Sequence, residues 1–258
     1  MPRSNPGLLL PVATLWRREM VRFFRQRSRI IGSFGTPLLF WLLLSSGLGP
    51  SFRPPGDEVG AYGYFFPGAL ALILLFTSIF ANISVIEDRR EGFLQGVLVA
   101  PIPRIALVLG KILGGATIAA LQAAVLFAMA ALGGLELGNA DPLGVVAAIL
   151  TVALAISALG FGFAWWLNSV QGFHGIMNLL LMPMWVLSGA LFPASGLPPV
   201  MKALFAANPM VYGLAWIRHA LGSAGGDLPG LSVSVGVTAA FAAVSLAFAV
   251  LAIVRKPV

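Results

Sequence analysis

Residues 143–167 read LGVVAAILTVALAISALGFGFAWWL, and this stretch contains no charged residue. A helix that crosses the hydrocarbon of a bilayer needs about 20 apolar residues, because the core is about 30 Å thick and each residue adds about 1.5 Å. The stretch is long enough to cross, and its lack of charge favours a membrane span over a helix of a water-soluble domain. The sequence therefore predicts an integral membrane protein.

Five further stretches meet the same criterion. The six expected spans cover residues 30–49, 64–86, 105–132, 143–167, 175–192 and 231–254. Of the 258 residues, 59% are apolar and only 10% are charged, whereas a soluble domain carries roughly a quarter charged residues. We expect an all-α membrane protein with one domain over residues 1–258. Residues 1–29 precede a six-span bundle at 30–254, and residues 193–230 form an extracytoplasmic or re-entrant segment.

The basic residues set the expected orientation. Of the 16 Lys and Arg residues, all but Arg53, Lys202 and Arg218 fall on the side of the N-terminus, the second and fourth loops and the C-terminus. Because cytoplasmic loops carry the excess of Lys and Arg, we expect both termini to be cytoplasmic and the protein to lie in the inner, cytoplasmic membrane. The sequence has no cysteine, which excludes disulfides and thiolate metal sites.

Residues 14–29 predict an amphipathic helix before the first span. At about 100° per residue, four arginines share one face and three apolar side chains share the opposite face. The arginines are Arg18, Arg22, Arg25 and Arg29, and the apolar residues are Trp16, Met20 and Phe23. This pattern is typical of a helix in the membrane interface, with its arginines toward anionic headgroups. It is either a topology anchor alone or also a docking surface for a cytoplasmic partner, and we expect no nucleic-acid partner.

Residues 87–104 read EDRREGFLQGVLVAPIPR, a mixed-charge cluster followed by an apolar strip. Pro101 and Pro103 end any helix before the next span. One interpretation is a solvated loop with surface ion pairs that contribute little. The interpretation that we favour is a docking site, because an apolar strip beside charges is costly to leave in water.

The same loop resembles the coupling region of the membrane subunits of ABC type-2 exporters. The matching residues are Arg90, Glu91, Gly92, Leu94, Pro101 and Arg104, while Phe93 replaces the usual threonine and Gln95 the usual glutamate. Three more stretches resemble the family in the correct order: the arginine-rich entry at 22–44, the turn at 187–198 and the segment NPMVYGLAWIR at 208–218. The last is similar to the family signature Pro-apolar-x-Tyr-x5-Arg through Pro209, Tyr212 and Arg218. Together the stretches look more like the drug and lipo-oligosaccharide export branch than the long-polysaccharide branch.

The resemblance implies six spans per subunit, an interface helix before them and short re-entrant helices between the fifth and sixth. It also implies a second permease subunit, which we expect to be an identical copy, and a cytoplasmic ABC ATPase subunit. The residues that would couple to that ATPase are Glu87, Asp88, Arg89, Arg90, Glu91, Gly92, Phe93 and Arg104. ATP and Mg²⁺ would bind the partner, because Gly110-Lys111-Ile112 lacks the preceding glycine and the hydroxyl of a phosphate-binding loop. We therefore expect no cofactor and no catalytic site in this chain.

Polar residues inside the apolar stretches need hydrogen bonds. Asn82, Gln122 and Asn178 either bond between helices or line a pathway. Lys111 is expected to extend toward the cytoplasm beside Arg104. Residues 199–207 and 212–221 are too short to span and fit re-entrant helices, the alternative being a lipid-facing surface loop.

The expected function is export of an amphipathic or lipid-linked molecule, such as a drug, a lipid or a glycolipid, driven by a separate ATPase. A function of a different class remains open, namely a membrane scaffold or assembly factor that docks a cytoplasmic partner without transport. An intramembrane enzyme is disfavoured because no acid–base constellation is present.

Overall fold

The computed structural model describes residues 7–48, 60–135, 138–194, 197–223 and 228–255, and every regular element in these ranges is a helix. Six helices are long and apolar enough to cross a membrane. They are α2 (Arg27–Leu48), α3 (Gly60–Arg90), α5 (Arg104–Leu132), α6 (Pro142–Trp166), α7 (Val170–Trp185) with its π-helical continuation η1 (Val186–Ala190), and α10 (Leu231–Arg255). The predicted all-α class and the six predicted spans are confirmed.

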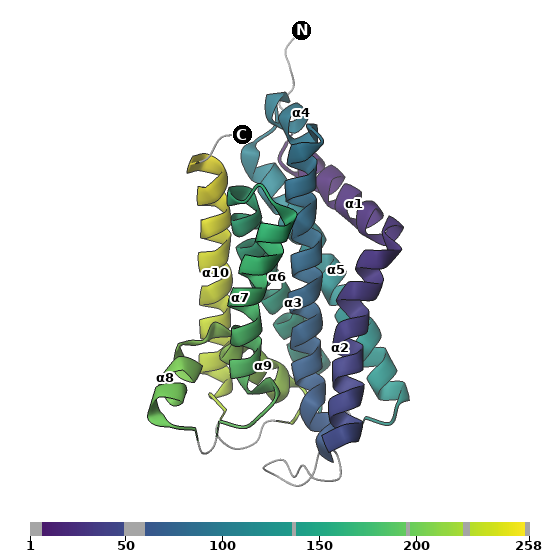
Figure 1. Ribbon diagram of the computed structural model, residues 1–258, viewed down its shortest axis with the longest axis vertical. Coiled ribbons are helices and arrows are strands. Elements are labelled where there is room, and N and C mark those ends of the chain that lie inside the picture. The colour runs from purple at the N-terminus through teal and green to yellow at the C-terminus, as the bar shows by residue number, and fades with distance from the viewer. Residues whose placement is uncertain (1–6, 49–59, 136–137, 195–196, 224–227, 256–258) are drawn as a thin grey trace.

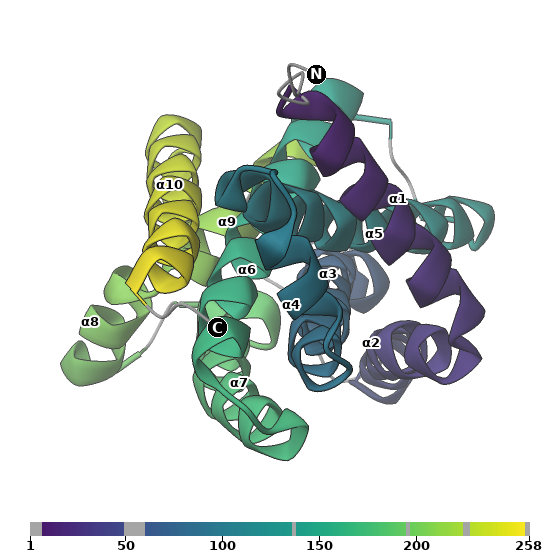
Figure 2. The ribbon, with the colours of Figure 1, turned by 90° about the horizontal axis from the view of Figure 1, so that it is seen from above.

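Four shorter helices complete the described chain: α1 (Leu9–Arg25), α4 (Phe93–Val99), α8 (Pro199–Ala207) and α9 (Pro209–Ala220). In Figure 1, α1 and α4 lie at the upper end of the bundle, where α10 also ends, and α8 and α9 lie at the opposite end. The view along the bundle in Figure 2 shows α3 at its centre, with α2 and α7 on either side. Short helices therefore mark both ends of the bundle.

Helix α3 is the most buried span, with 83% of its apolar window inside the protein. Its neighbours include α2, α5, α6 and α7. Two buried tryptophans are hydrogen-bonded to its backbone: Trp41 Nε1 donates to the carbonyl of Tyr62 at 3.1 Å, and Trp185 Nε1 donates to the carbonyl of Gly68 at 2.8 Å. Buried indole N–H groups need such partners. The first and fifth spans are thereby fixed to the second.

The segment between the fifth and sixth spans contains two short helices, as expected, and α8 meets α9 at a bend of 76°. The second helix begins at Pro209 rather than near residue 212. Asn208 explains the difference, because its side-chain oxygen accepts from the backbone N–H of Met210 at 3.0 Å and caps α9. A proline in the first turn costs nothing there, since that position has no helical partner for an N–H.

Several boundaries differ from the sequence prediction, and the fifth span begins at Val170 rather than at residue 175. The second span does not end at residue 86, because Glu87–Arg90 form the last turn of α3. The predicted helix 14–29 is divided at Gln26, so that Arg29 belongs to α2 and not to α1. The expected connection 50–63 lies mostly outside the described residues, as do residues 195–196 and 224–227 of the segment 193–230.

Candidate functional site

Helix α1 packs closely on α5 at two glycines. A Cβ atom on Gly110 would lie 2.6 Å from the Cβ of Leu15, and one on Gly114 would lie 2.7 Å from the Cβ of Glu19. Both distances are too short for a side chain, so only glycine permits this approach. The face of α1 that it buries carries Pro11, Leu15, Glu19 and Phe23. The close approach therefore brings an acidic side chain into the interior.

Glu19 meets Lys111 and Asp88 in a buried cluster at the junction of α1, α3 and α5. Lys111 Nζ lies 2.7 Å from Glu19 Oε1 and also contacts the carboxylate of Asp88. Ser84 completes the cluster, since its hydroxyl donates to Glu19 Oε2 at 2.6 Å and accepts from Lys111 at 3.1 Å. Glu19 is 5% exposed, Lys111 4% and Asp88 0%. Charges buried this deeply require partners of opposite sign.

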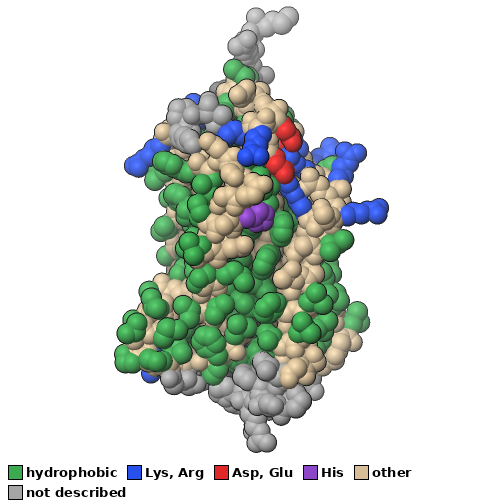
Figure 3. Space-filling model, in the orientation of Figure 1, with side chains coloured by type: hydrophobic (Ala, Val, Ile, Leu, Met, Phe, Trp, Pro, Cys, Tyr) green, Lys and Arg blue, Asp and Glu red, His purple; other side chains and the backbone are tan. Residues whose placement is uncertain are grey.

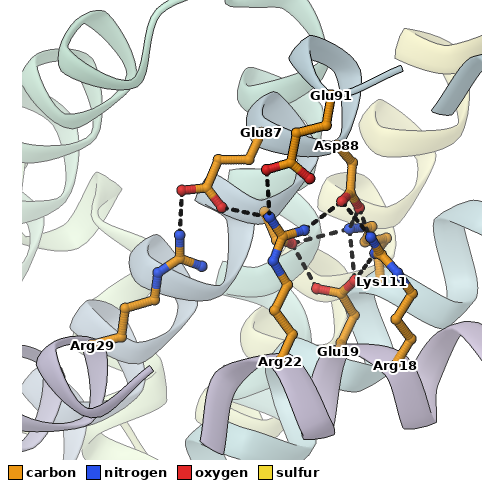
Figure 4. A network of polar contacts seen from close by, with 9 residues as sticks. Arg18, Glu19, Arg22, Arg29, Glu87, Asp88, Glu91 and Lys111 are labelled. Carbon is orange, nitrogen blue, oxygen red and sulfur yellow. Dashed lines mark hydrogen bonds and ion pairs between the residues drawn. The ribbon is translucent and has the colours of Figure 1, made fainter. Parts of the chain in front are cut away.

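Three arginines surround the cluster (Figure 4). Arg18 binds Asp88 with both terminal nitrogens, at 2.8 and 2.7 Å, in the bidentate geometry that suits a carboxylate. Arg22 contacts Asp88 and donates to Glu87 Oε2 at 2.8 Å, and Arg29 of α2 contacts Glu87 from the other side. Burial alone would lower the pKa of Arg18, but the hydrogen bonds and charge of Asp88 raise it above its ordinary value. Arg18 therefore stays charged.

Four acidic and four basic side chains form the complete charge network, seven of them on α1, α2, α3 and α5 and the eighth, Glu91, just after α3. Its members are Arg18, Glu19, Arg22, Arg29, Glu87, Asp88, Glu91 and Lys111. The formal charges cancel. We call this set the charge network.

Helix α4 is attached directly to the charge network. Gly92 adopts a φ of 78°, which permits the sharp turn from α3 into α4. The guanidinium of Arg18 lies 3.6 Å from the centroid of the Phe93 ring, so the same arginine contacts both Asp88 and α4. Leu94 is buried while Val99 is 84% exposed. The short helix is therefore anchored on one face and free on the other.

The two arginines at the end of α3 bind the opposite side of the bundle. Arg89 donates to the carbonyls of Trp165 and Leu167, at 2.6 and 3.2 Å, and to Asn168 Oδ1 at 2.9 Å. Arg90 donates to the carbonyl of Asn168 at 2.7 Å. These acceptors lie where α6 ends, and helix ends leave carbonyls without intrahelical partners. The end of α3 is thus held to α1 on one side and to α6 on the other.

The structure brings together some of the candidate residues and not others. Glu87, Asp88, Glu91 and Phe93 join Arg18, Arg22 and Arg29 at one site, while Arg89 and Arg90 turn toward α6. Arg25 and Arg104 are exposed and form no ion pair within the described chain.

The arginines of the first two helices are placed differently from the interpretation drawn from the sequence. Arg18, Arg22 and Arg29 face carboxylates of α3, where headgroups were expected. Lys111 was expected to extend toward the cytoplasm beside Arg104, but its ammonium does not reach solvent there, because it is buried against Glu19 and Asp88. Glu19 was missed altogether. The sequence feature that could have identified Glu19 is its spacing: it is an acidic residue four positions from both Leu15 and Phe23, on the face that α1 buries.

The three amide side chains in the spans differ in their hydrogen bonding: Asn82 and Gln122 are bonded to other helices, and within the described residues Asn178 is not. Asn82 donates to the carbonyls of Ser78 and Ser157 at 2.8 and 3.2 Å, and Gln122 donates to Ser33 Oγ at 3.0 Å. The bond from Asn82 to Ser157 and the bond from Gln122 to Ser33 are interhelical, as the bonding interpretation predicted, while the bond from Asn82 to Ser78 lies within α3. Asn178 is exposed on α7 and forms no hydrogen bond with any residue that the structure describes.

At the opposite end of the bundle, Arg218 of α9 is 5% exposed. It donates to the carbonyls of Tyr64 and Gly189 at 3.2 and 3.0 Å, and its guanidinium lies 4.3 Å from the centroid of the Tyr64 ring. Gly189 has a φ of 88° in the break that ends α7. Tyr212 donates to the carbonyl of Ala206 at 2.8 Å and links α9 to α8. Arg218 therefore joins α9, η1 and the start of α3.

Comparison with known proteins gives a consistent result. A family model described as "ABC-2 type transporter" matches residues 11–221. The chain is 27% identical to Nodulation protein J of Rhizobium leguminosarum bv. trifolii over 83% of this chain and 82% of the relative. It is 24% identical to Nodulation protein J of Neorhizobium galegae over 90% and 88% of the two chains. The matched region includes both the charge network and Arg218.

Proposed function

Because the chain belongs to the ABC-2 type transporter family, we propose that it is the permease subunit of an ATP-driven exporter in the inner, cytoplasmic membrane. The protein is a multi-pass membrane transporter subunit. In the proposal, both termini and α4 are cytoplasmic, and a separate ABC ATPase binds ATP and Mg²⁺. A second copy of this chain completes the pathway, through which an amphipathic or lipid-linked molecule leaves the cell.

The position of the charge network directly behind α4 is the observation that carries this proposal. Val99 offers an exposed apolar contact to a docked ATPase, while Phe93 and Gly92 connect α4 to Arg18 and α3. The network consists of paired, largely buried charges, which hold their partners in fixed geometry. A displacement of α4 would therefore move α1, α3 and α5 together rather than bend a loop.

Helix α3 would carry this movement across the membrane. Its far end is bound by Arg218 of α9, which also binds the carbonyl of Gly189 in the break after α7. Nucleotide-driven movement of α4 would shift the spans between two packings, one closed and one open at the α8–α9 end. In this proposal α8 and α9 close the outer end of the pathway, which is supported by their position opposite α4 (Figure 1).

The exposed faces of α2 and α7 support a pathway shared with a second subunit. Only 22% of the apolar window of α2 and 39% of that of α7 are buried, and the two helices lie on either side of α3 (Figure 2). Asn178 is exposed on α7. An amide in hydrocarbon needs a hydrogen-bond partner, and a second subunit or the water and cargo of a pathway would supply it.

The docking step can be tested with two matched valines. Val99 on α4 and Val200 on α8 are both largely exposed, at 84% and 73%, but lie at opposite ends of the bundle. The ATPase that copurifies with the wild-type protein in mild detergent is first identified by mass spectrometry. Val99→Asp should abolish its copurification, while Val200→Asp should leave it unchanged. Equal retention of the ATPase by both variants would refute docking at α4.

The scaffold function remains the alternative, since α4 and the charge network could also dock a partner that does no transport. Reconstituted permease and ATPase distinguish the two functions. For an exporter, hydrolysis should rise when a cargo lipid or drug is added to the vesicles and the cargo should cross the bilayer. For a scaffold, neither quantity responds to any cargo.

A further inference from the structure

A groove runs along the outward side of α1 next to Glu91. Its volume is about 540 Å³, and its lining includes Arg17, Arg18, Val21, Arg22, Arg25 and Glu91. Four arginines in one groove are unusual in a chain in which only 10% of the residues are charged. The sequence pattern predicted headgroup contacts for the arginines of this helix in general, whereas the structure pairs some of them with carboxylates and so narrows the question to those that remain.

The four arginines divide into two kinds. Arg18 and Arg22 are neutralised by Asp88 and Glu87, so the charge network accounts for them. Arg17 and Arg25 are exposed and have no carboxylate within ion-pair distance in the part of the chain that the structure describes. The groove therefore has an excess of positive charge, which favours an anionic occupant.

The two free arginines lie on one stripe of α1, four residues to either side of Val21. Val21 is 48% exposed, and Phe24 on the same outward side is 52% exposed. Apolar side chains beside free cations match a ligand that has both an anionic head and an apolar tail. In Figure 3 the Lys and Arg side chains at the upper right, over α1 and the start of α2, stand directly above the hydrophobic belt of the spans.

We propose that this groove binds the phosphate of an anionic phospholipid from the surrounding leaflet. Arg17 and Arg25 hold the phosphate oxygens, and an acyl chain lies along Val21 and Phe24. Glu91 in the groove wall repels a second anionic group but accepts hydrogen bonds. Arg17 and Arg25 outnumber this carboxylate, so a net anionic headgroup with a single phosphate and neutral hydroxyl donors, as in phosphatidylglycerol, fits better than a zwitterionic one.

The proposal rests on the membrane location of the protein and not on its ATPase, so it is tested without nucleotide. The full chain is purified in detergent and mixed with phosphatidylglycerol, phosphatidylethanolamine or phosphatidylcholine of equal acyl chains. Lipid retained per protein is measured by native mass spectrometry. Phosphatidylglycerol should be retained at least about 5-fold more than phosphatidylcholine, because that is the factor expected for a single basic side chain at an anionic surface and the site holds two.

The variant Arg17→Gln/Arg25→Gln should lose this preference. The control Arg27→Gln/Arg255→Gln removes two exposed arginines outside the groove lining and should keep it. Equal retention of phosphatidylglycerol and phosphatidylcholine by the wild type, or an unchanged preference in the groove variant, overturns the proposal. Displacement of the lipid by inorganic phosphate would instead show a site for a free anion.

Two further outcomes would overturn the assignment of the occupant. Retention of phosphatidylethanolamine equal to that of phosphatidylglycerol would contradict the anionic headgroup. Loss of ATPase copurification from the groove variant, with its lipid preference intact, would show that the groove docks a protein. A failure of the proposed transport function would leave the lipid measurement unaffected, because that measurement requires neither ATPase nor cargo.

Discussion

Glu19 Oε1 lies 2.7 Å from Lys111 Nζ, although Glu19 precedes the first span and Lys111 lies inside the third. Gly114 makes this contact geometrically accessible, because the Cβ of Glu19 occupies the space in which a side chain at Gly114 would lie. An ordinary helix–helix separation would hold the carboxylate away from the ammonium. The ion pair between Glu19 and Lys111 therefore depends on the glycine at position 114.

Gly114→Ala should destabilise the protein. The added methyl would lie 2.7 Å from the Cβ of Glu19, so α1 must move outward and the ion pair with Lys111 lengthens. We expect a loss of about 1–3 kcal/mol, typical of overpacking, measured as a lower melting temperature in detergent. The control is Gly236→Ala on α10, where a methyl meets nothing within 4 Å. It should be neutral or stabilising, because alanine favours helix over glycine by about 1 kcal/mol.

Lys111→Met should destabilise the protein more strongly. It leaves Glu19 and Asp88 buried without their shared ammonium, and breaking a buried ion pair costs about 3–5 kcal/mol. The matched control is Lys202→Met on α8, where the lysine is exposed. Thermal unfolding followed by tryptophan fluorescence measures both variants.

The double variant Glu19→Met/Lys111→Met provides an internal check on this prediction. Replacing both partners by apolar side chains removes the uncompensated charge, so stability should recover partly toward the wild type. A double variant that is as unstable as the sum of the two single changes would show that the pair contributes no mutual stabilisation.

Asp88→Asn should separate ATP hydrolysis from export. The amide keeps the shape of the side chain but removes the negative charge that Arg18, Arg22 and Lys111 share. We expect reconstituted ATPase activity to persist while cargo export falls at least about tenfold, which corresponds to about 1.4 kcal/mol. Asp141→Asn is the control, since Asn and Asp are equivalent caps for α6. Parallel loss of hydrolysis and export would contradict a coupling role.

Arg218→Met should loosen the end of the bundle at which α8 and α9 lie. The change frees the carbonyls of Tyr64 and Gly189, which Arg218 now joins. Since the natural sequence contains no cysteine, Ser188→Cys introduces a single reporter next to the break in α7, at a position that is fully buried. Labelling of this cysteine by a water-soluble maleimide should rise several-fold in the Arg218→Met background. An unchanged labelling rate would show that the contacts of Arg218 do not keep this end closed.

The spans could be predicted from the sequence because apolar length is a local property that requires no knowledge of neighbours. The charge network could not. Residues 87–90 looked too polar for a helix in or near lipid, and they are helical because arginines of α1 and α2 neutralise Glu87 and Asp88. Glu19 and Lys111 each looked like an isolated charge, because their pairing depends on two helices meeting at Gly114. Asn178 is a different case. It resembles Asn82 in sequence, as an amide within an apolar stretch, but it has no hydrogen-bond partner among the described residues of the single chain.

The pairing between α1 and α3 also has a consequence for biosynthesis. Translation produces Arg18, Arg22 and Arg29 before Glu87 and Asp88, so these arginines emerge from the ribosome as unpaired cations. In the proposed orientation, with both termini cytoplasmic, they would count fully during that interval toward the rule that retains positive charge on the side of synthesis. Once α3 inserts, its carboxylates neutralise them, so the same charges would serve first to direct insertion and then to hold the folded protein together.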